Sequence, residues 1–123
     1  MARKNPAVFD PHPFLKKVGN GKTVIRCKKN SRLFSQGDRA NAVFYIQEGR
    51  VKLTVTSPHG REAVVTILEK GAFCGESCLT GQKVCLATAT SINGSTIVRI
   101  TKAAMIRALH NDPTFSTLFM ARK

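Results

Sequence analysis

One segment, Phe73-Cys74-Gly75-Glu76-Ser77-Cys78-Leu79, has the residue types of a site that holds an anion with main-chain atoms. A strand can end at Phe73, Gly75 lets the backbone turn, and Glu76 to Leu79 can form one short helical turn. Such a turn directs several backbone N–H groups toward one point, where an anion is held without dedicated side chains. The segment is therefore a candidate anion-binding site.

A site for a nucleotide phosphate normally adds a cation a few residues later. The next segment is Gly81-Gln82-Lys83-Val84-Cys85-Leu86-Ala87, in which Lys83 is the best-placed cation and three uncharged residues follow it. A lysine offers a point charge on a flexible stem, whereas an arginine offers a planar fork. Lys83 is the candidate cation of this site.

Thiol chemistry is the second candidate, because the chain has four cysteines, Cys27, Cys74, Cys78 and Cys85. The last three surround the anion-binding segment, but thiolate ligand sets prefer tighter pairs such as C-x-x-C. Buried, inert thiols are the default interpretation. Two alternatives stay open: a redox-responsive Cys78–Cys85 pair, whose thiol pKa is lowered by a helix N-terminus and by Lys83, and a metal site.

The sequence gives little support for catalysis. The seven acidic residues are spread thinly, and no Ser-His-Asp order or histidine pair stands at a recognisable spacing. The scattered histidines, His12, His59 and His110, fit structural or solvent-exposed positions. Glu76 is better placed to accept a hydrogen bond than to act as a general base. We therefore expect a protein that is not an enzyme.

Composition and charge set the broad class. The chain has 123 residues, a length typical of one domain, and its hydrophobic fraction of 42% is ordinary for a globular protein. Its formal net charge of +13 attracts nucleic acid, acidic proteins or anionic membranes. Residues 1–39 hold much of this charge; solvated surface is the default interpretation, and a basic face for DNA or an acidic partner is the alternative.

The chain shows neither an apolar run of signal-peptide length near its start nor a stretch approaching a membrane span. We therefore expect a cytoplasmic protein without membrane contact, and reduced cysteines are consistent with that compartment. Three regions are expected. They are a basic arm over residues 1–21 rich in Pro, Gly and Lys, a β-rich body over 22–100 containing the segment 73–87, and C-terminal helices over 101–123.

The body consists of short β-rich runs separated by glycine turns about every 10–12 residues, which favours an antiparallel sandwich or jelly roll. Strands are expected over residues 23–28, 43–48, 51–55, 62–68, 86–92 and 96–100. The second and third should meet across Gly49, and the last two around Asn93-Gly94, a strong hairpin signal. In the third, Val51, Leu53 and Val55 alternate with Lys52, Thr54 and Thr56, which predicts one wet face.

Residues after Ile100 change to a helical period. Thr101 can N-cap a helix over Lys102–Leu109, in which Ala103, Ile106, Arg107 and His110 fall at helical spacing. Asp112 can cap a second helix that begins at Pro113. That helix carries an apolar stripe of Phe115, Leu118 and Phe119, with Met120 beside it. If exposed, this stripe indicates either a longer parent protein or a partner that covers it.

Four ordered motifs together resemble the cyclic-nucleotide-binding domain of the Crp/Fnr bacterial transcription regulators. They are Leu33-Phe34-Ser35-Gln36-Gly37-Asp38, Phe44-Tyr45-Ile46-Gln47-Glu48-Gly49-Arg50-Val51, Gly71-Ala72-Phe73-Cys74-Gly75-Glu76 and Ala87-Thr88-Ala89. The resemblance covers about residues 22–120. It implies a mainly β fold, the double-stranded β-helix (jelly roll) of that domain, with short flanking helices.

The resemblance also implies a phosphate-binding cassette over residues 73–87. Gly75 and Glu76 match the family's cassette Gly and ribose-binding Glu, and the amides of Ser77, Cys78 and Leu79 would face the phosphate. Cyclic-AMP binders complete the cassette with Arg, then Ser or Thr, then Ala. Here those positions are Cys85, Leu86 and Ala87, so the guanidinium fork and the hydroxyl are missing.

That departure lowers the expected affinity for cyclic AMP, since a charged hydrogen bond contributes about 1.5–3 kcal/mol. A cyclic nucleotide remains one candidate ligand. We favour either a different small effector or a cassette that binds no ligand and is retained for packing. The resemblance implies a homodimeric full-length regulator that contacts DNA only through a C-terminal helix-turn-helix outside this chain. The alternatives are a stand-alone, ligand-free interaction module and a redox or metal sensor that uses the cassette cysteines.

Overall fold

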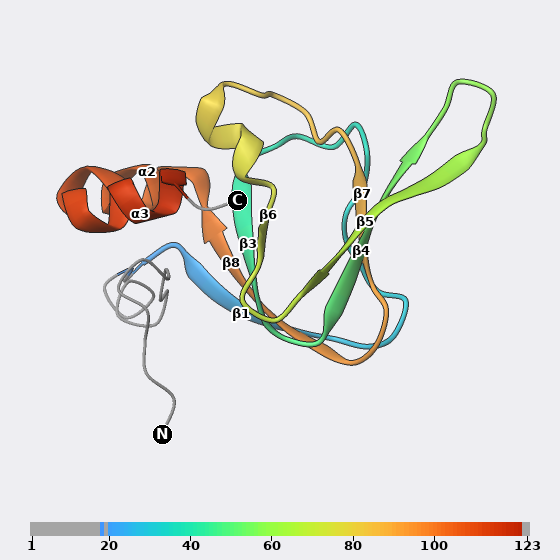
Figure 1. The fold of residues 1–123 in the computed structure, drawn as a ribbon, viewed down its shortest axis with the longest axis horizontal. Helices are drawn as coiled ribbons and strands as arrows, with labels where there is room; N and C mark the ends of the chain where they lie inside the picture. The colour runs from blue at the N-terminus through green and yellow to red at the C-terminus, as the bar shows by residue number, and fades with distance from the viewer. Residues whose placement is uncertain (1–17, 19, 122–123) are drawn as a thin grey trace.

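A computed structural model describes Val18 and residues 20–121 of the chain. The basic arm expected over residues 1–21 therefore lies almost wholly outside the described residues. The body is built from strands and short helices (Figure 1). The strands are β1 Lys22–Cys27, β2 Arg32–Phe34, β3 Ala42–Glu48, β4 Arg50–Thr56, β5 Glu62–Glu69, β6 Phe73–Cys74, β7 Thr88–Ser91 and β8 Ser95–Thr101. The helices are η1 Glu76–Thr80, α2 Lys102–Asn111 and α3 Pro113–Ala121.

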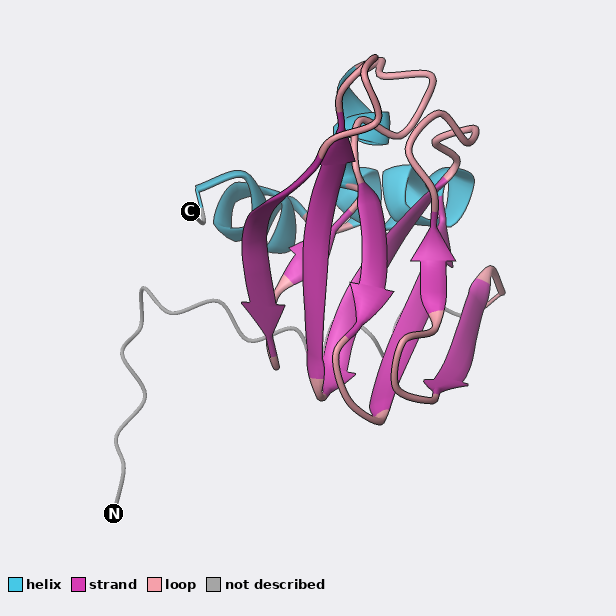
Figure 2. Ribbon diagram, turned by 90° about the vertical axis from the view of Figure 1, so that its right-hand side faces the viewer, coloured by secondary structure: helices cyan, strands magenta, loops and turns pink. Residues whose placement is uncertain are grey.

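The strands form two antiparallel four-stranded sheets, with the orders β1-β8-β3-β6 and β2-β7-β4-β5. The two sheets face each other across the interior of the body, and the helices lie at one side and one end (Figures 1 and 2). This arrangement confirms the mainly β, jelly-roll class with short flanking helices.

Both predicted hairpins are wrong. Strand β3 pairs with β6 and β8, and β4 pairs with β5 and β7, so the chain changes sheet at Gly49. The Asn93-Gly94 turn likewise carries the chain from β7 in one sheet to β8 in the other. A turn signal fixes where the backbone reverses, whereas the pairing partner is decided by which apolar faces meet across the interior.

Contacts at these two crossings explain why the turns lie together. Gly49 has a φ of +95°, and a Cβ placed on it would stand 2.8 Å from the Ser95 Cα atom. The Arg50 amide donates a hydrogen bond of 3.0 Å to the Asn93 side-chain oxygen. The two crossings between the sheets therefore contact each other directly, and position 49 accommodates only glycine.

The expected alternation along β4 fails in its second half. The pairing of β4 with β5 shifts between Leu53 and Thr54, where an irregularity interrupts the ladder. Thr54 is 2% exposed, although strict alternation places it on the wet face with Lys52. The residue left without a partner is Val65 of β5, and β4 keeps a regular register with β7 through Thr54, so the irregularity does not change which way Thr54 points. Burial at Thr54 depends on what covers that face, which sequence periodicity does not reveal.

The sheet that contains β3 and β8 carries a core on each face. Val43, Tyr45 and Ile100 face the helices and pack with Met105 and Phe119. Alternate residues of the same strands, among them Phe44, Ile46 and Ile97, face the other sheet and pack with Val51 and Ala89. This alternation follows from the period of two in a strand, and it fixes which β8 side chains point into the roll.

Helix α2 begins as predicted, because the Thr101 Oγ1 atom accepts a hydrogen bond of 3.2 Å from the Ala104 amide. Its buried residues are Ala104 and Met105. The helically spaced set of Ala103, Ile106, Arg107 and His110 is exposed instead, so that set does not mark the buried face. The buried face consists of Ala104 and Met105 with Ala108 and Leu109 beside them, which also fall at helical spacing.

Helix α3 begins at Pro113, as predicted. The expectation of an exposed apolar stripe is wrong for Phe119, which is 4% exposed and meets the Phe73 ring edge-on at 5.2 Å. Met120 is 64% exposed. The side chains of Phe115 and Leu118 lie outside the described part of the structure. Among the described residues, neither helix has the length and apolar character of a membrane span.

Candidate ligand-binding site

The segment 73–81 has the predicted geometry of a strand, a glycine turn and a short helix. Strand β6 ends at Cys74, Gly75 adopts a left-handed conformation with a φ of +81°, and η1 runs over Glu76–Thr80. A Cβ on Gly75 would lie 3.0 Å from the Ala42 carbonyl oxygen and 3.4 Å from the Phe44 ring. Gly75 is therefore required both by the turn and by the close approach of β3.

The second half of the segment is held by main-chain hydrogen bonds to the loop that precedes β3. The Ala40 amide donates to the Lys83 carbonyl at 2.9 Å, and the Cys85 amide donates to the Asp38 carbonyl at 2.7 Å. The Gly37 amide donates to the Cys85 carbonyl at 2.8 Å. These bonds place Cys85 and the two residues after it opposite η1. The loop residues Gly37 to Ala40, which make these bonds, were not identified by sequence reasoning.

Between these two halves lies a cavity of about 370 Å³. Six of the nine predicted site residues line it: Gly75, Glu76, Ser77, Cys85, Leu86 and Ala87. Phe34 of β2 and Leu53 of β4 line the cavity from the opposite sheet. Ala40, from the loop before β3, and Thr80 of η1 line it as well. The cavity thus has cassette residues on one side and apolar side chains from the sheet on the other.

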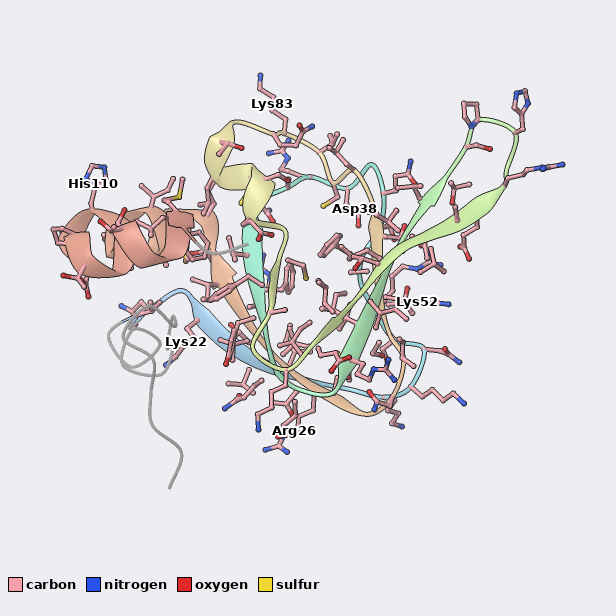
Figure 3. The ribbon with its side chains drawn as sticks, in the orientation of Figure 1. Lys22, Arg26, Asp38, Lys52, Lys83 and His110 are labelled. Carbon is pink, nitrogen blue, oxygen red and sulfur yellow. The ribbon has the colours of Figure 1, made fainter. Side chains whose placement is uncertain are left out.

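Three predicted residues do not line this cavity. Cys78 is fully buried in the helix-side core, with its thiol 3.8 Å from the Ala42 carbonyl oxygen. Leu79 packs against the same core and borders a groove next to α2 and α3. Lys83 lines a separate surface cavity with Arg39 and Lys102, and its side chain points outward (Figure 3). Lys83 therefore does not supply a cation to the cassette cavity.

The expected lowering of a cassette thiol pKa is wrong. Burial raises the pKa of Cys74 to about 12, with smaller contributions from Glu76 and Cys85. Burial also raises the pKa of Cys78 against the opposing effect of Lys102, and burial with the Asp38 charge raises the pKa of Cys85. All four cysteines are free thiols. A protonated thiol is a poor nucleophile and a poor ligand, so the environment disfavours redox or metal chemistry.

The described part of the chain contains no group of three or more His, Cys, Asp or Glu residues arranged to hold a metal ion. Of the cysteines in the segment 73–87, Cys74 and Cys78 are buried. The metal-sensor alternative therefore has no geometric support in these residues.

Sequence reasoning missed two arginines. A second cavity, of about 170 Å³, shares Phe34, Gly75 and Cys85 with the first, and Arg39 and Arg99 line it. Arg99 stands opposite Phe44 in the β8–β3 ladder, on the face that Ile97 turns to the roll interior. The signal was present, because β8 alternates in the order Ile97, Val98, Arg99 and Ile100, and the alternation puts Arg99 on the same face as Ile97.

A jelly roll with a strand–glycine–short-helix segment above an interior cavity is the arrangement that the resemblance implies. The family model for the cyclic nucleotide-binding domain matches residues 24–112 of the chain. The chain belongs to this family. The match includes every residue of both cavities.

Solved structures show the same fold. The sensor domain of the transcriptional regulator DNR from Pseudomonas aeruginosa matches with a TM-score of 0.78 at 22% identity, over 89% of this chain and 73% of that chain. The catabolite activator protein of Thermus thermophilus matches with a TM-score of 0.78 at 18% identity, over 89% of this chain and 51% of the other.

The c-di-GMP responsive regulator CLP of Xanthomonas campestris matches with a TM-score of 0.73 at 17% identity, over 80% of this chain and 48% of that chain. The chain thus spans about half the length of the last two proteins. A search of curated proteins found no significant match to this sequence.

Proposed function

We propose that this cyclic nucleotide-binding domain is the effector-sensing part of a Crp/Fnr-type transcription regulator. The observation that supports this most is the cassette cavity, in which the Gly75 turn, Glu76 and Ser77 stand opposite apolar side chains of the other sheet. A cavity of about 370 Å³ has the size of small-molecule sites, and it combines an apolar wall with a few polar groups. In this proposal the domain acts in the cytoplasm and performs no catalysis.

The proposed mechanism is a population shift that the cassette passes to the C-terminal helices. A groove of about 460 Å³ separates η1 from α2 and α3, and Leu79, Leu109 and Phe119 are among its lining residues. Leu79 comes from the cassette and packs on the core that holds Phe119. A ligand that favours one position of η1 therefore changes the support of α3. In a homodimeric full-length protein, this change would reorient a DNA-reading domain joined beyond α3.

The structure gives a reason to expect weak binding of cyclic AMP. At the position of the cassette arginine, Cys85 lines the cavity with a thiol whose pKa is raised by burial and by Asp38. It offers no positive charge. Leu86 is 60% exposed and brings no hydroxyl. Cyclic AMP is thus a poor effector for this domain, and a different small molecule is the better candidate.

Isothermal titration calorimetry with cyclic AMP and cyclic GMP tests the site. The unmodified domain should bind cyclic AMP weakly, and the double variant Cys85→Arg, Leu86→Ser should bind at least about tenfold more tightly, because it restores a fork and a hydroxyl. The matched control, Val84→Arg, places the same charge one residue earlier, outside the cassette cavity. If the double variant gains no more affinity than this control, the cavity is not a cassette site.

A ligand-free interaction module is the second candidate. Its supporting observation is β5, an edge strand on which Val64 and Val65 are 57% and 59% exposed. Exposed apolar side chains on an edge strand favour contact with another protein surface. Substituting both residues with threonine would weaken such an association.

A further inference from the structure

Arg99 is a cation inside the roll that the cassette pattern does not account for. It lies on β8 between Val98 and Ile100, whose side chains face the helices, and its own side chain faces the opposite way with Ile97. It is partly buried and lines the smaller cavity with Gly75 and Cys85. The fold therefore carries a guanidinium to the back of the cassette from a different strand.

The side chain of Arg99 forms no hydrogen bond or ion pair with any of the described residues. A guanidinium has five N–H donors, and withdrawing it from water without partners is unfavourable. An anion that enters the cavity would supply these partners. Arg99 is thus a partly buried cation without a side-chain partner among the described residues.

Charge in the lining of the smaller cavity favours an anion as well. Arg39 lines it from the loop before β3, where the main chain of that loop is bridged to Val84. The acidic residue of the lining is Asp38, and one oxygen of its carboxylate accepts a hydrogen bond of 2.9 Å from the Ser35 amide. Two guanidinium groups against one carboxylate leave this cavity with a net positive lining.

The lining of the larger cavity is mainly apolar, with Glu76 and Ser77 on its cassette side. Phe34, Leu53 and Leu86 line it, and the Phe34 ring stands 5.2 Å from the Phe44 ring of the facing sheet. Phe34 and Gly75 also line the smaller cavity, so the two cavities meet at these residues. An apolar chamber that adjoins a cationic one is complementary to a molecule with an apolar body and one charged end.

We infer that the effector of this domain is a small organic anion whose charged end is bound by Arg99, with Arg39 beside it, and whose apolar body fills the cavity between Phe34 and the cassette. The inference rests on the proposed sensing function and names its ligand class. It also assigns a role to the loss of the cassette arginine: the anion-binding guanidinium now comes from β8. A carboxylate or sulfonate matches the bidentate fork of an arginine.

The test uses two dyes of similar shape, the anionic anilinonaphthalenesulfonate and the neutral phenylnaphthylamine, titrated by fluorescence against the full chain. Octanoate and octanol serve as competitors that differ in their charged end. Arg99→Gln should weaken binding of the anionic dye about tenfold, the loss expected for one charged hydrogen bond. The neutral dye should bind as before, and octanoate should displace the anionic dye better than octanol.

Arg26→Gln is the matched control, since Arg26 is an exposed arginine of β1 and lines neither cavity. It changes the net charge equally and should leave both dyes unaffected. Equal losses in the Arg99→Gln and Arg26→Gln variants would reduce the effect to overall charge and overturn the inference. Unchanged binding of the anionic dye by Arg99→Gln would overturn it as well.

Folding of the variants is followed by circular dichroism and thermal melting. If Arg99→Gln melts early, Arg99→Lys replaces it: the point charge without a fork should retain part of the affinity, and full affinity would contradict the inference. If neither dye binds the unmodified chain, the cavity itself is closed and the proposed sensing function fails. Dye binding that is independent of Arg99 removes only the present inference and leaves the sensing function standing.

Discussion

At the residue scale, the arginine side chain beside Gly75 and Cys85 comes from β8 and not from the segment 73–87. Cys85 stands at the position that the resemblance assigns to a cassette arginine, and burial together with Asp38 raises the pKa of its thiol. Arg99 brings a guanidinium to the same region from β8. Lys83, although it belongs to the segment 73–87, points away from the cassette cavity (Figure 3). The charge at this site therefore depends on strand register rather than on proximity in the chain.

Cys74 predicts a pH dependence of stability. Its pKa is raised from 9.0 to about 12 in the folded chain by burial, so the folded state holds this proton after the unfolded state has lost it. The corresponding stability is complete below about pH 9 and is lost as the pH rises toward 12, by about 1.4 kcal/mol for each pH unit. Urea unfolding at pH 8, 9.5 and 10.5 measures this slope.

The variant Cys74→Ala removes the titrating thiol and should flatten the slope over that pH range. It also loses some packing at every pH, which does not affect the comparison of slopes. An equally steep decline in this variant would assign the effect to other groups and contradict the burial argument.

At the scale of elements, the cassette is held from two directions. The Gly75 turn presses against β3, and the residues before β7 are hydrogen-bonded to the loop that includes Asp38 and Ala40. The first contact requires a residue without a side chain, and the second uses only main-chain atoms. The position of the cassette is thus fixed by backbone geometry, which leaves the side chains at 85 and 86 free to vary with the ligand.

Gly75→Ala should destabilise the domain more than Gly60→Ala. Both glycines have a positive φ, which costs an alanine about 1–2 kcal/mol. A Cβ at position 60 meets no atom within 4 Å, whereas one at position 75 meets the Ala42 carbonyl oxygen at 3.0 Å. The free energy of unfolding, measured in urea, should therefore fall further for Gly75→Ala. Equal losses would show that the close approach to β3 is not maintained.

At the scale of the whole molecule, one sheet serves two cores. Its inner face closes the roll and lines the cavities, while its outer face carries the helices (Figure 2). Phe73, on the strand that leads into the cassette, meets Phe119 of α3 edge-on. The ligand cavity and the C-terminal helices thus share the strands β3, β6 and β8, which is the physical connection that the proposed mechanism needs.

Phe119→Ala tests this connection. Removal of a buried phenylalanine typically costs about 3–5 kcal/mol, whereas Met120→Ala should change stability by less than about 0.5 kcal/mol because Met120 is 64% exposed. Urea unfolding measures both. If the mechanism holds, Phe119→Ala also changes the affinity for the anionic dye and Met120→Ala does not. A destabilised Phe119→Ala variant with unaltered dye affinity would separate α3 from the cavity.

The sequence alone determined the features that depend on local backbone chemistry. The turn at Gly75, the short helix after it, the Thr101 N-cap and the helix start at Pro113 all follow from what a few adjacent residues permit, and the ordered motifs identified the family and the jelly roll.

Only the tertiary structure decided which segments meet. It moved the partner of β3 from β4 to β8, buried Thr54, Cys78 and Phe119, and brought Arg99 behind the cassette. Pairing, register and burial are set by how apolar faces combine across the whole domain. That sum over distant residues is not contained in any local pattern, so the place of Arg99 behind the cassette could be recognised only in the folded chain, although the alternation of β8 indicates which face it shares with Ile97.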